Sequence, residues 1–222
     1  MNIALTSDLP LTANQAVFKL MRKRHSHPRI VWIPPSTRTG REHFPIAQEQ
    51  FAAHGFSNLE YCDIDEDLDE MQLAVLDQYN VIYLTGGDPI GFRRNILQSG
   101  LSIRLQQCLV AGCLVVAASG GSMQLTKNVS LFRLVNNPLE KVLAERNEYD
   151  ALGIVEYEVL PHLDRLESSF LEKVRRYSER MDHDVIGLAD GAALLCISTD
   201  KYFCDGLVTR FRKGEVKLIE TA

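Results

Sequence analysis

The feature that most constrains the fold of this chain is the alternation of short apolar runs with longer segments of helical periodicity. The central runs at 81–85 and 114–118 are apolar almost throughout, as strands buried on both faces of a sheet tend to be. Between such runs, apolar residues recur at helical spacing, as in 13–21 and 166–177. This order predicts a mostly parallel sheet covered by helices on both faces, which is a three-layer α/β/α sandwich. The expected strands are 2–6, 30–33, 59–62, 81–85, 114–118, 154–159, 185–188 and 193–197.

The C-terminal third of the chain changes to the rhythm of a β-hairpin. We expect the hairpin over 202–220, with Lys213-Gly214 as its turn, and it predicts an antiparallel extension of the sheet. Capping boxes that begin at Thr12 and at Thr39 indicate the starts of two helices. No linker, repeat or low-complexity segment interrupts the sequence, so residues 1–222 are expected to form a single domain.

Composition and charge narrow the classes of partner. The net charge of -5 argues against a surface for nucleic acid or anionic membranes, and no apolar run approaches the length of a bilayer span. The five cysteines are odd in number and lack framework spacing, and residues 1–5 form a strand-like run rather than a signal peptide. We therefore expect reduced thiols and a cytoplasmic location. The oligomeric state stays open, with a homodimer as one option.

Metal and cofactor binding find little support in the sequence. Neither Cys-x-x-Cys nor His-Glu-x-x-His occurs, and His25 and His27 lie in a basic turn that is typical of a surface. We therefore expect no metal ion and no cofactor.

The stretch 114–123 carries the strongest chemical signal. An apolar run ends at Ser119, and a helix-compatible segment follows directly, which is the arrangement of a nucleophile elbow. The sharp turn requires small neighbours, and Ala117, Gly120 and Gly121 provide them, although Ala117 stands where the first glycine of G-x-S-x-G would be. Ser119 is therefore a candidate nucleophile. The alternative is a serine that only caps the following helix.

A base and an orienting acid are available at other predicted strand ends. His162 follows the run 154–159 and the stiffening Pro161, which places it well as a general base for Ser119. Asp190 ends the run 185–188 and is the first candidate for the group that orients the imidazole. Asp164 is its rival, since it follows His162 by two residues, but a helix N-cap is the other role for this side chain.

Two glycines follow the strand-like run 81–85. Gly86-Gly87 would let a backbone N–H point into the crevice, and together with the N–H of Gly120 this makes a two-donor oxyanion hole. A phosphate-binding loop is the weaker interpretation, because neither G-x-G-x-x-G nor a Walker lysine is present.

The order of these motifs resembles the dipeptidase E family of serine peptidases, relatives of cyanophycinase. The motifs are, in order, strand–Gly-Gly-Asp, small-x-Ser-Gly-Gly-Ser, Leu-Pro-His and Val-Ile-Gly-Leu-Ala-Asp-Gly. The resemblance spans nearly the whole chain. It implies a fold similar to the class I glutamine amidotransferases, with serine in place of the amidotransferase cysteine. It also implies Ser119 as nucleophile, His162 as base and Asp190 as orienter at a position often held by glutamate, with Gly87 and Gly120 as oxyanion donors.

The same resemblance bears on the substrate. It implies a peptidase that cleaves small peptides, while the basic residues with which aspartyl-dipeptidase members select an N-terminal Asp have no clear equivalent. Phe170 falls near the expected place, with Arg165 and Arg175 close in sequence. The sequence therefore predicts the hydrolytic machinery without an aspartyl preference.

Two further hypotheses accompany the peptidase. The first is a non-catalytic member of the same fold that binds a small ligand, suggested by departures around the elbow, such as Asp88 where asparagine is frequent. The second is an amidotransferase-like enzyme, which is disfavoured because Cys113 lies upstream in the strand and not at the turn. Ser122 is a further candidate nucleophile, but it lies a turn into the helix, where a supporting hydrogen bond is the expected role.

Overall fold

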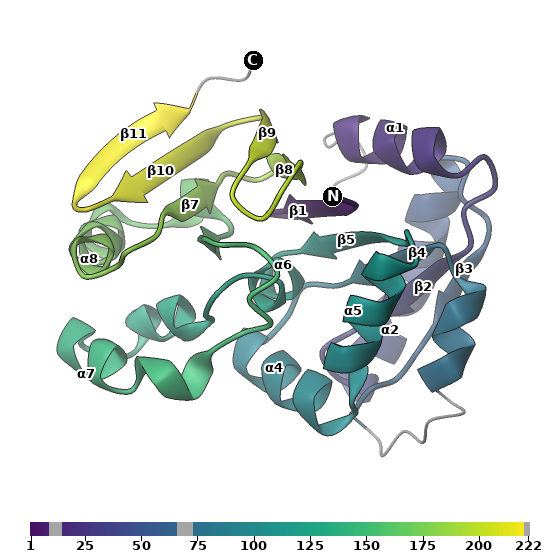
Figure 1. Ribbon diagram of the computed structural model, residues 1–222, viewed down its shortest axis with the longest axis horizontal. Coiled ribbons are helices and arrows are strands. Elements are labelled where there is room, and N and C mark those ends of the chain that lie inside the picture. Colours follow the sequence, from purple (N-terminus) through teal and green to yellow (C-terminus); the bar gives the residue numbers. More distant parts are fainter. Residues whose placement is uncertain (9–14, 66–72, 220–222) are drawn as a thin grey trace.

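A seven-stranded main sheet forms the centre of the molecule (Figure 1). The computed structural model describes residues 1–8, 15–65 and 73–219. The strand order is β3-β2-β4-β5-β1-β8-β9, in which the first five strands are parallel and the last two are antiparallel to their neighbours. The strands are β1 (Ile3–Thr6), β2 (Ile30–Ile33), β3 (Leu59–Tyr61), β4 (Val81–Leu84), β5 (Leu114–Ala118), β8 (Ala193–Cys196) and β9 (Tyr202–Asp205).

Helices cover both faces of the main sheet, as the apolar runs require. On β4, Ile82 and Leu84 pack toward helices α4 and α5, whereas Val81 and Tyr83 pack toward α1 and α2. This alternation follows from the pleat, which points successive side chains to opposite faces. The α/β sandwich with a mostly parallel sheet is thus confirmed. The α-helices are α1 (Gln15–Arg24), α2 (Thr37–Ala53), α4 (Pro89–Gln98), α5 (Leu101–Val110), α6 (Gly120–Gln124), α7 (Leu139–Ala144) and α8 (Ser168–Glu179).

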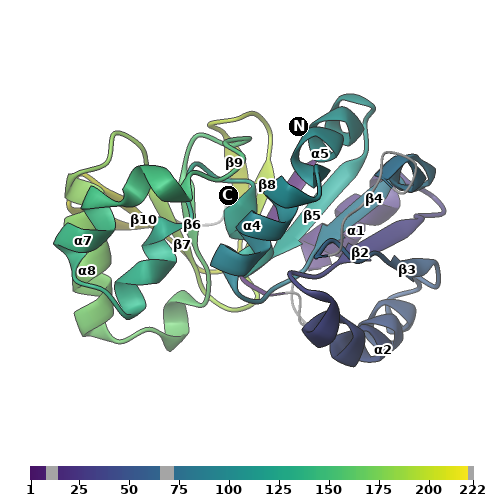
Figure 2. The same ribbon diagram turned by 90° about the horizontal axis from the view of Figure 1, so that it is seen from below.

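A second, four-stranded sheet was not anticipated as a separate unit. Its order is β11-β10-β7-β6, and β6 and β7 are parallel. Helix α8 packs against β10, and a third apolar cluster fills the space between them. Figure 2 shows this unit, with α7 and α8, at the opposite end of the molecule from β3. Its strands are β6 (Glu158–Leu160), β7 (Val185–Leu188), β10 (Val208–Arg212) and β11 (Glu215–Ile219).

The C-terminal hairpin is confirmed for β10 and β11, and its bounds differ from the expectation. Lys213 and Gly214 form the turn, both with positive φ, as a two-residue hairpin turn requires. The segment 202–205 instead pairs with β8 in the main sheet, and residue 220 lies outside the described part of the chain. The expected strand 154–159 starts only at Glu158 and runs to Leu160 as β6. Its expected first residues are not part of the sheet, because the amides of Ile154 and Val155 bond to the carbonyl of Leu125.

The start of α2 is a second correction. The helix begins at Thr37 after Ser36, not at the box that opens with Thr39. A carboxylate oxygen of Asp65 accepts the amide of Thr37 at 2.8 Å, so a distant loop satisfies this helix end. The other expected cap, Thr12, lies outside the described residues.

Short 3-10 turns connect these elements. They are η1 (Val75–Gln78), η2 (Ser130–Val135), η3 (Arg146–Tyr149) and η4 (Leu163–Arg165). Within the described ranges, no helix combines the length and the apolar character needed to cross a bilayer.

Candidate active site

Ser119 occupies a strained turn between β5 and α6. Its backbone has φ 49° and ψ -120°, a conformation that costs a non-glycine residue about 1–3 kcal/mol. The turn is held at its start, because the amide of Ser119 donates to the carbonyl of Thr6 on the neighbouring strand at 3.0 Å. Such a turn projects the hydroxyl from the end of the strand, as in a nucleophile elbow.

Ser122 supports this turn from within. Its side chain is fully buried, and its hydroxyl lies 2.7 Å from the carbonyl oxygen of Thr6 and 2.6 Å from that of Ala117. The Oγ of Ser122 also accepts a hydrogen bond from the backbone amide of Thr6 at 3.1 Å. Ser122 therefore ties β1 to the end of β5 and is not exposed to a substrate.

The backbone around the turn leaves no room for larger residues. A methyl group on Gly120 would lie 2.2 Å from the carbonyl oxygen of Gly87. Gly87 itself has φ 134°, a conformation that favours glycine, and a methyl group there would lie 2.5 Å from Pro35. The two glycines thus bring the loop after β4 against the first residue of α6. Because the amide of Gly120 is the first in its helix, it has no intrahelical partner and is suited to hold an oxyanion.

His162 reaches Ser119 from the second sheet. It follows the end of β6 and has φ 57°, so it is also held in the left-handed region. Its Nε2 lies 2.9 Å from the Oγ of Ser119. Among the described non-glycine residues, only Ser119, His162 and the hairpin residue Lys213 have positive φ. Backbone strain therefore falls on both members of this pair, as is common at active sites.

Asp190 completes the row of hydrogen-bonded groups. It follows β7, and its Oδ1 lies 2.6 Å from the Nδ1 of His162. Asp164, the rival acid, points elsewhere, since its carboxylate accepts the backbone amide of Asp190 at 2.8 Å. Asp164 is therefore neither the group beside the imidazole nor a helix N-cap. It fixes the loop that carries Asp190.

The sequence did not point to Ser7 or Asp8 as contributors to this site, nor to a contact between Arg165 and Asp190. The hydroxyl of Ser7 donates to Asp190 at 3.0 Å and accepts the backbone amide of His162 at 2.8 Å. Arg165 forms an ion pair with the other oxygen of Asp190, and Asp8 accepts the amide of Gly191 at 2.9 Å. A signal for Ser7 and Asp8 was available, because both directly follow the buried strand β1 at the edge where the other site residues lie.

The surroundings of Asp190 favour its charged form. Partial burial opposes ionisation, but hydrogen bonds from His162, Ser7 and Arg165 outweigh that effect and hold the pKa of Asp190 below its usual range. The carboxylate is thus available to accept the Nδ1 proton of His162 and to leave Nε2 facing Ser119.

Cysteine offers no rival nucleophile at this site. Cys113 precedes β5 at the end opposite to Ser119, and its Sγ bonds to the carbonyl of Tyr79 at 3.4 Å. Burial raises the pKa of all five thiols, to about 11 for Cys62, Cys108 and Cys196. For these three, about one thiol in a thousand is ionised at pH 8.

We therefore expect iodoacetamide at pH 8 to leave the activity of the folded protein unchanged. Intact-mass spectrometry should show little alkylation within the time that alkylates all five cysteines of the guanidinium-unfolded protein. Rapid loss of activity in parallel with a single alkylation would instead indicate a functional thiol.

A comparison with models of protein families decides the family. The model of peptidase family S51 matches residues 6–202 of this chain. The chain belongs to peptidase family S51. The resemblance to the dipeptidase E family is thereby confirmed. The uncharacterized peptidase Lin0382 of Listeria innocua is 27% identical over 101 residues, which are 46% of this chain. The match spans 47% of the length of that curated relative.

Solved structures of peptidases share the fold of this S51 member. A peptidase from an acI-B1 Actinobacterium superposes with a TM-score of 0.71 at 18% identity, over 99% of this chain and 94% of the other. A putative Peptidase E protein from Listeria monocytogenes EGD-e gives 0.67 at 19% identity, over 99% and 98%. At such identities the likeness concerns the fold alone.

Proposed function

We propose that this S51 protein is a serine peptidase that hydrolyses small peptides, of dipeptide size, through an acyl-enzyme on Ser119. The observation that carries the proposal is the unbroken row of contacts from Ser119 Oγ to His162 Nε2, 2.9 Å, and from His162 Nδ1 to Asp190 Oδ1, 2.6 Å. A nucleophile, a base and an orienting acid in hydrogen-bond reach of one another are what nucleophilic catalysis by serine requires.

In the first half of the reaction, Ser119 attacks the carbonyl carbon of the scissile peptide bond. His162 Nε2 takes the hydroxyl proton, and Asp190 stabilises the imidazolium that forms. The amides of Gly87 and Gly120 donate to the oxyanion of the tetrahedral intermediate. As the carbon–nitrogen bond breaks, His162 returns the proton to the leaving amine.

In the second half, water replaces the amine. His162 takes a proton from the water as its oxygen attacks the ester carbonyl, and the same two amides hold the new oxyanion. Collapse of this intermediate returns the proton to Ser119 Oγ and releases the acid product. Neither half requires a metal or a cofactor. The free state of the five cysteines supports a cytoplasmic setting for this reaction.

The test is product analysis on a broad panel of dipeptides. We expect the folded protein to convert some of them into two free amino acids, detected by mass spectrometry, and to leave denatured casein intact. Ser119→Ala, purified in the same way, is the control for contaminating activity. If the folded protein cleaved no dipeptide, or cut casein internally, the proposed small-peptide activity would be wrong.

A further inference from the structure

A small cavity of about 130 Å³ opens directly beside Ser119 and His162. The oxyanion glycines, Gly87 and Gly120, form part of its wall. The remaining lining is apolar and comes from the start of α4, from α6 and η2, from the end of β6 and from the segment that leads into α8. These residues are Pro89, Met123, Phe132, Val135, Leu160, Pro161, Leu166 and Phe170. Among the described residues that line the cavity, none carries a charged side chain apart from the titratable His162.

Two of the lining residues lie open to solvent. Phe132 and Val135 are 41% and 51% exposed, although both belong to η2, whose other apolar residues Leu131 and Leu134 are fully buried. Covering exposed apolar surface with an apolar group is favourable in water. An apolar side chain seated between η2 and Phe170 would therefore gain from contacts that the free protein leaves unmade.

A negatively charged side chain would find no such gain. The neighbouring cation, Arg165, is already paired with Asp190, and one nitrogen of its guanidinium lies 3.7 Å from a carboxylate oxygen of Asp8. A carboxylate in the cavity would lose water without acquiring a positive partner from the lining, and this transfer is unfavourable. The cavity is thus matched to an apolar group by both its surface and its charge.

We propose that this cavity binds the side chain of the residue whose carbonyl Ser119 attacks, and that it selects apolar side chains over acidic ones. The inference rests on the proposed serine peptidase activity. A carbonyl held at Ser119, with its oxygen toward Gly87 and Gly120, has its own Cα one bond away, so the adjoining side chain is the one that reaches the cavity. Its volume suits one side chain and not a longer stretch of peptide.

Diphenyl esters of α-aminoalkylphosphonates test this selection, because they carry the acyl-side side chain and no leaving residue. Ser119 Oγ attacks phosphorus, one phosphorus–phenoxide bond breaks, and the serine proton passes through His162 to the phenoxide. We expect the leucine and phenylalanine analogues to inactivate the protein at least about tenfold faster than the aspartate analogue. Equal rates, or a faster aspartate analogue, would overturn the selection.

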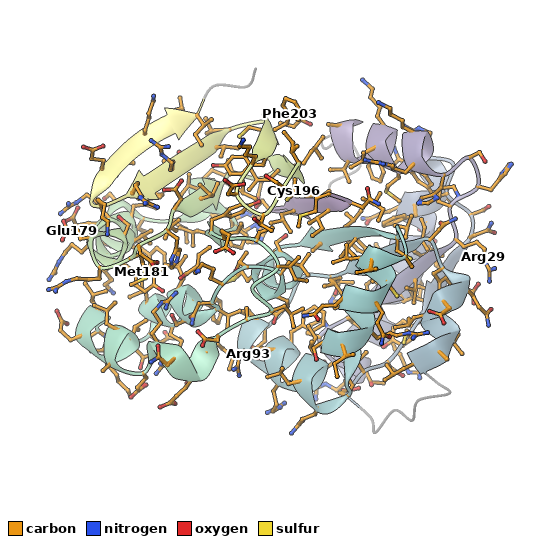
Figure 3. All side chains as sticks on the ribbon, in the orientation of Figure 1. Arg29, Arg93, Glu179, Met181, Cys196 and Phe203 are labelled. Carbon is orange, nitrogen blue, oxygen red and sulfur yellow. The ribbon has the colours of Figure 1, made fainter. Side chains whose placement is uncertain are left out.

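Arginine substitutions test whether the cavity is the part of the site that selects apolar over acidic side chains. Phe170→Arg places a cation in the lining and should narrow the leucine-to-aspartate ratio by about tenfold or more. Phe132→Arg, at a more exposed position, is the second variant and should act in the same direction. Phe203→Arg is the matched control. Phe203 lies on β9 (Figure 3), is 59% exposed and does not line the cavity. A ratio that changed equally in the control would contradict the assignment.

A fluorophosphonate without an amino-acid side chain distinguishes failure of the proposed peptidase activity from failure of the side-chain selection. If it labels Ser119 while the leucine analogue has no advantage, the peptidase activity stands and the selection is wrong. If it labels no serine of the folded protein, the proposed function fails and the selection fails with it. The control variant Phe203→Arg should react with the fluorophosphonate at the wild-type rate, because Phe203 does not line the cavity.

Discussion

Ser119→Ala is expected to lower kcat/KM for every hydrolysed dipeptide by about 10⁶-fold, to the level of binding and oxyanion stabilisation alone. The substitution removes the oxygen that lies 2.9 Å from His162 Nε2 and adds no bulk to the turn. Steady-state rates on the best dipeptide, with circular dichroism to verify the fold, provide the measurement.

Ser57→Ala is the matched control for this variant, because Ser57 is exposed and lies before β3, outside the site. It should retain the wild-type rate. Full activity of Ser119→Ala on any substrate that the wild type hydrolyses would remove Ser119 from the mechanism.

Asp190→Asn is expected to reduce kcat by about 10⁴-fold. The carboxylate oxygen accepts from both His162 Nδ1 and Ser7 Oγ, and the charge stabilises the imidazolium formed during attack. An amide can place its NH₂ toward His162 and favour the wrong tautomer, and it offers no charge. The measurement is kcat on the same dipeptide, compared with Asp164→Asn.

Asp164→Asn should cost far less, because an amide oxygen can still accept the backbone amide of Asp190. Equal losses in the two variants would show that the loop, and not the carboxylate beside the imidazole, matters for catalysis.

The lowered pKa of Asp190 also predicts that the free energy of unfolding depends on pH. Since its pKa is lowered in the folded state, its ionised form stabilises the fold above the unfolded-state pKa of about 3.9, and this contribution is lost as pH falls through the folded-state value. Urea unfolding should therefore show that acidification below about pH 4 destabilises the wild type more than Asp190→Asn.

Several parts of the site could be predicted because of the way parallel strands end. Gly87, Ser119, His162 and Asp190 each follow a strand, and the carboxyl ends of parallel strands lie at one edge of a sheet. The order of the runs therefore places Gly87 near Ser119 in the main sheet. It likewise places His162 near Asp190 in the second sheet, and only the structure shows that the two edges meet. In the structure, His162 lies in hydrogen-bond contact with Ser119 on one side and with Asp190 on the other.

Other parts depend on contacts that no local pattern contains. The runs that form β6 and β7 follow the same strand rhythm as those of the main sheet. Only the pairing of β7 with β10, and of β6 with β7, sets them apart as a second sheet. Ser7 acts through hydrogen bonds to two residues far along the chain, and Asp164 acts through one, so their roles follow from distance and not from sequence order. The same holds for Asp65 at the start of α2.

Intact-mass spectrometry after incubation with a fluorophosphonate measures whether Ser119 is an activated nucleophile. The wild type is predicted to gain a single adduct that is absent from Ser119→Ala and present in Ser57→Ala. An unmodified wild-type protein, shown to be folded, would contradict the claim and favour a member of the fold that binds a small ligand without hydrolysing it.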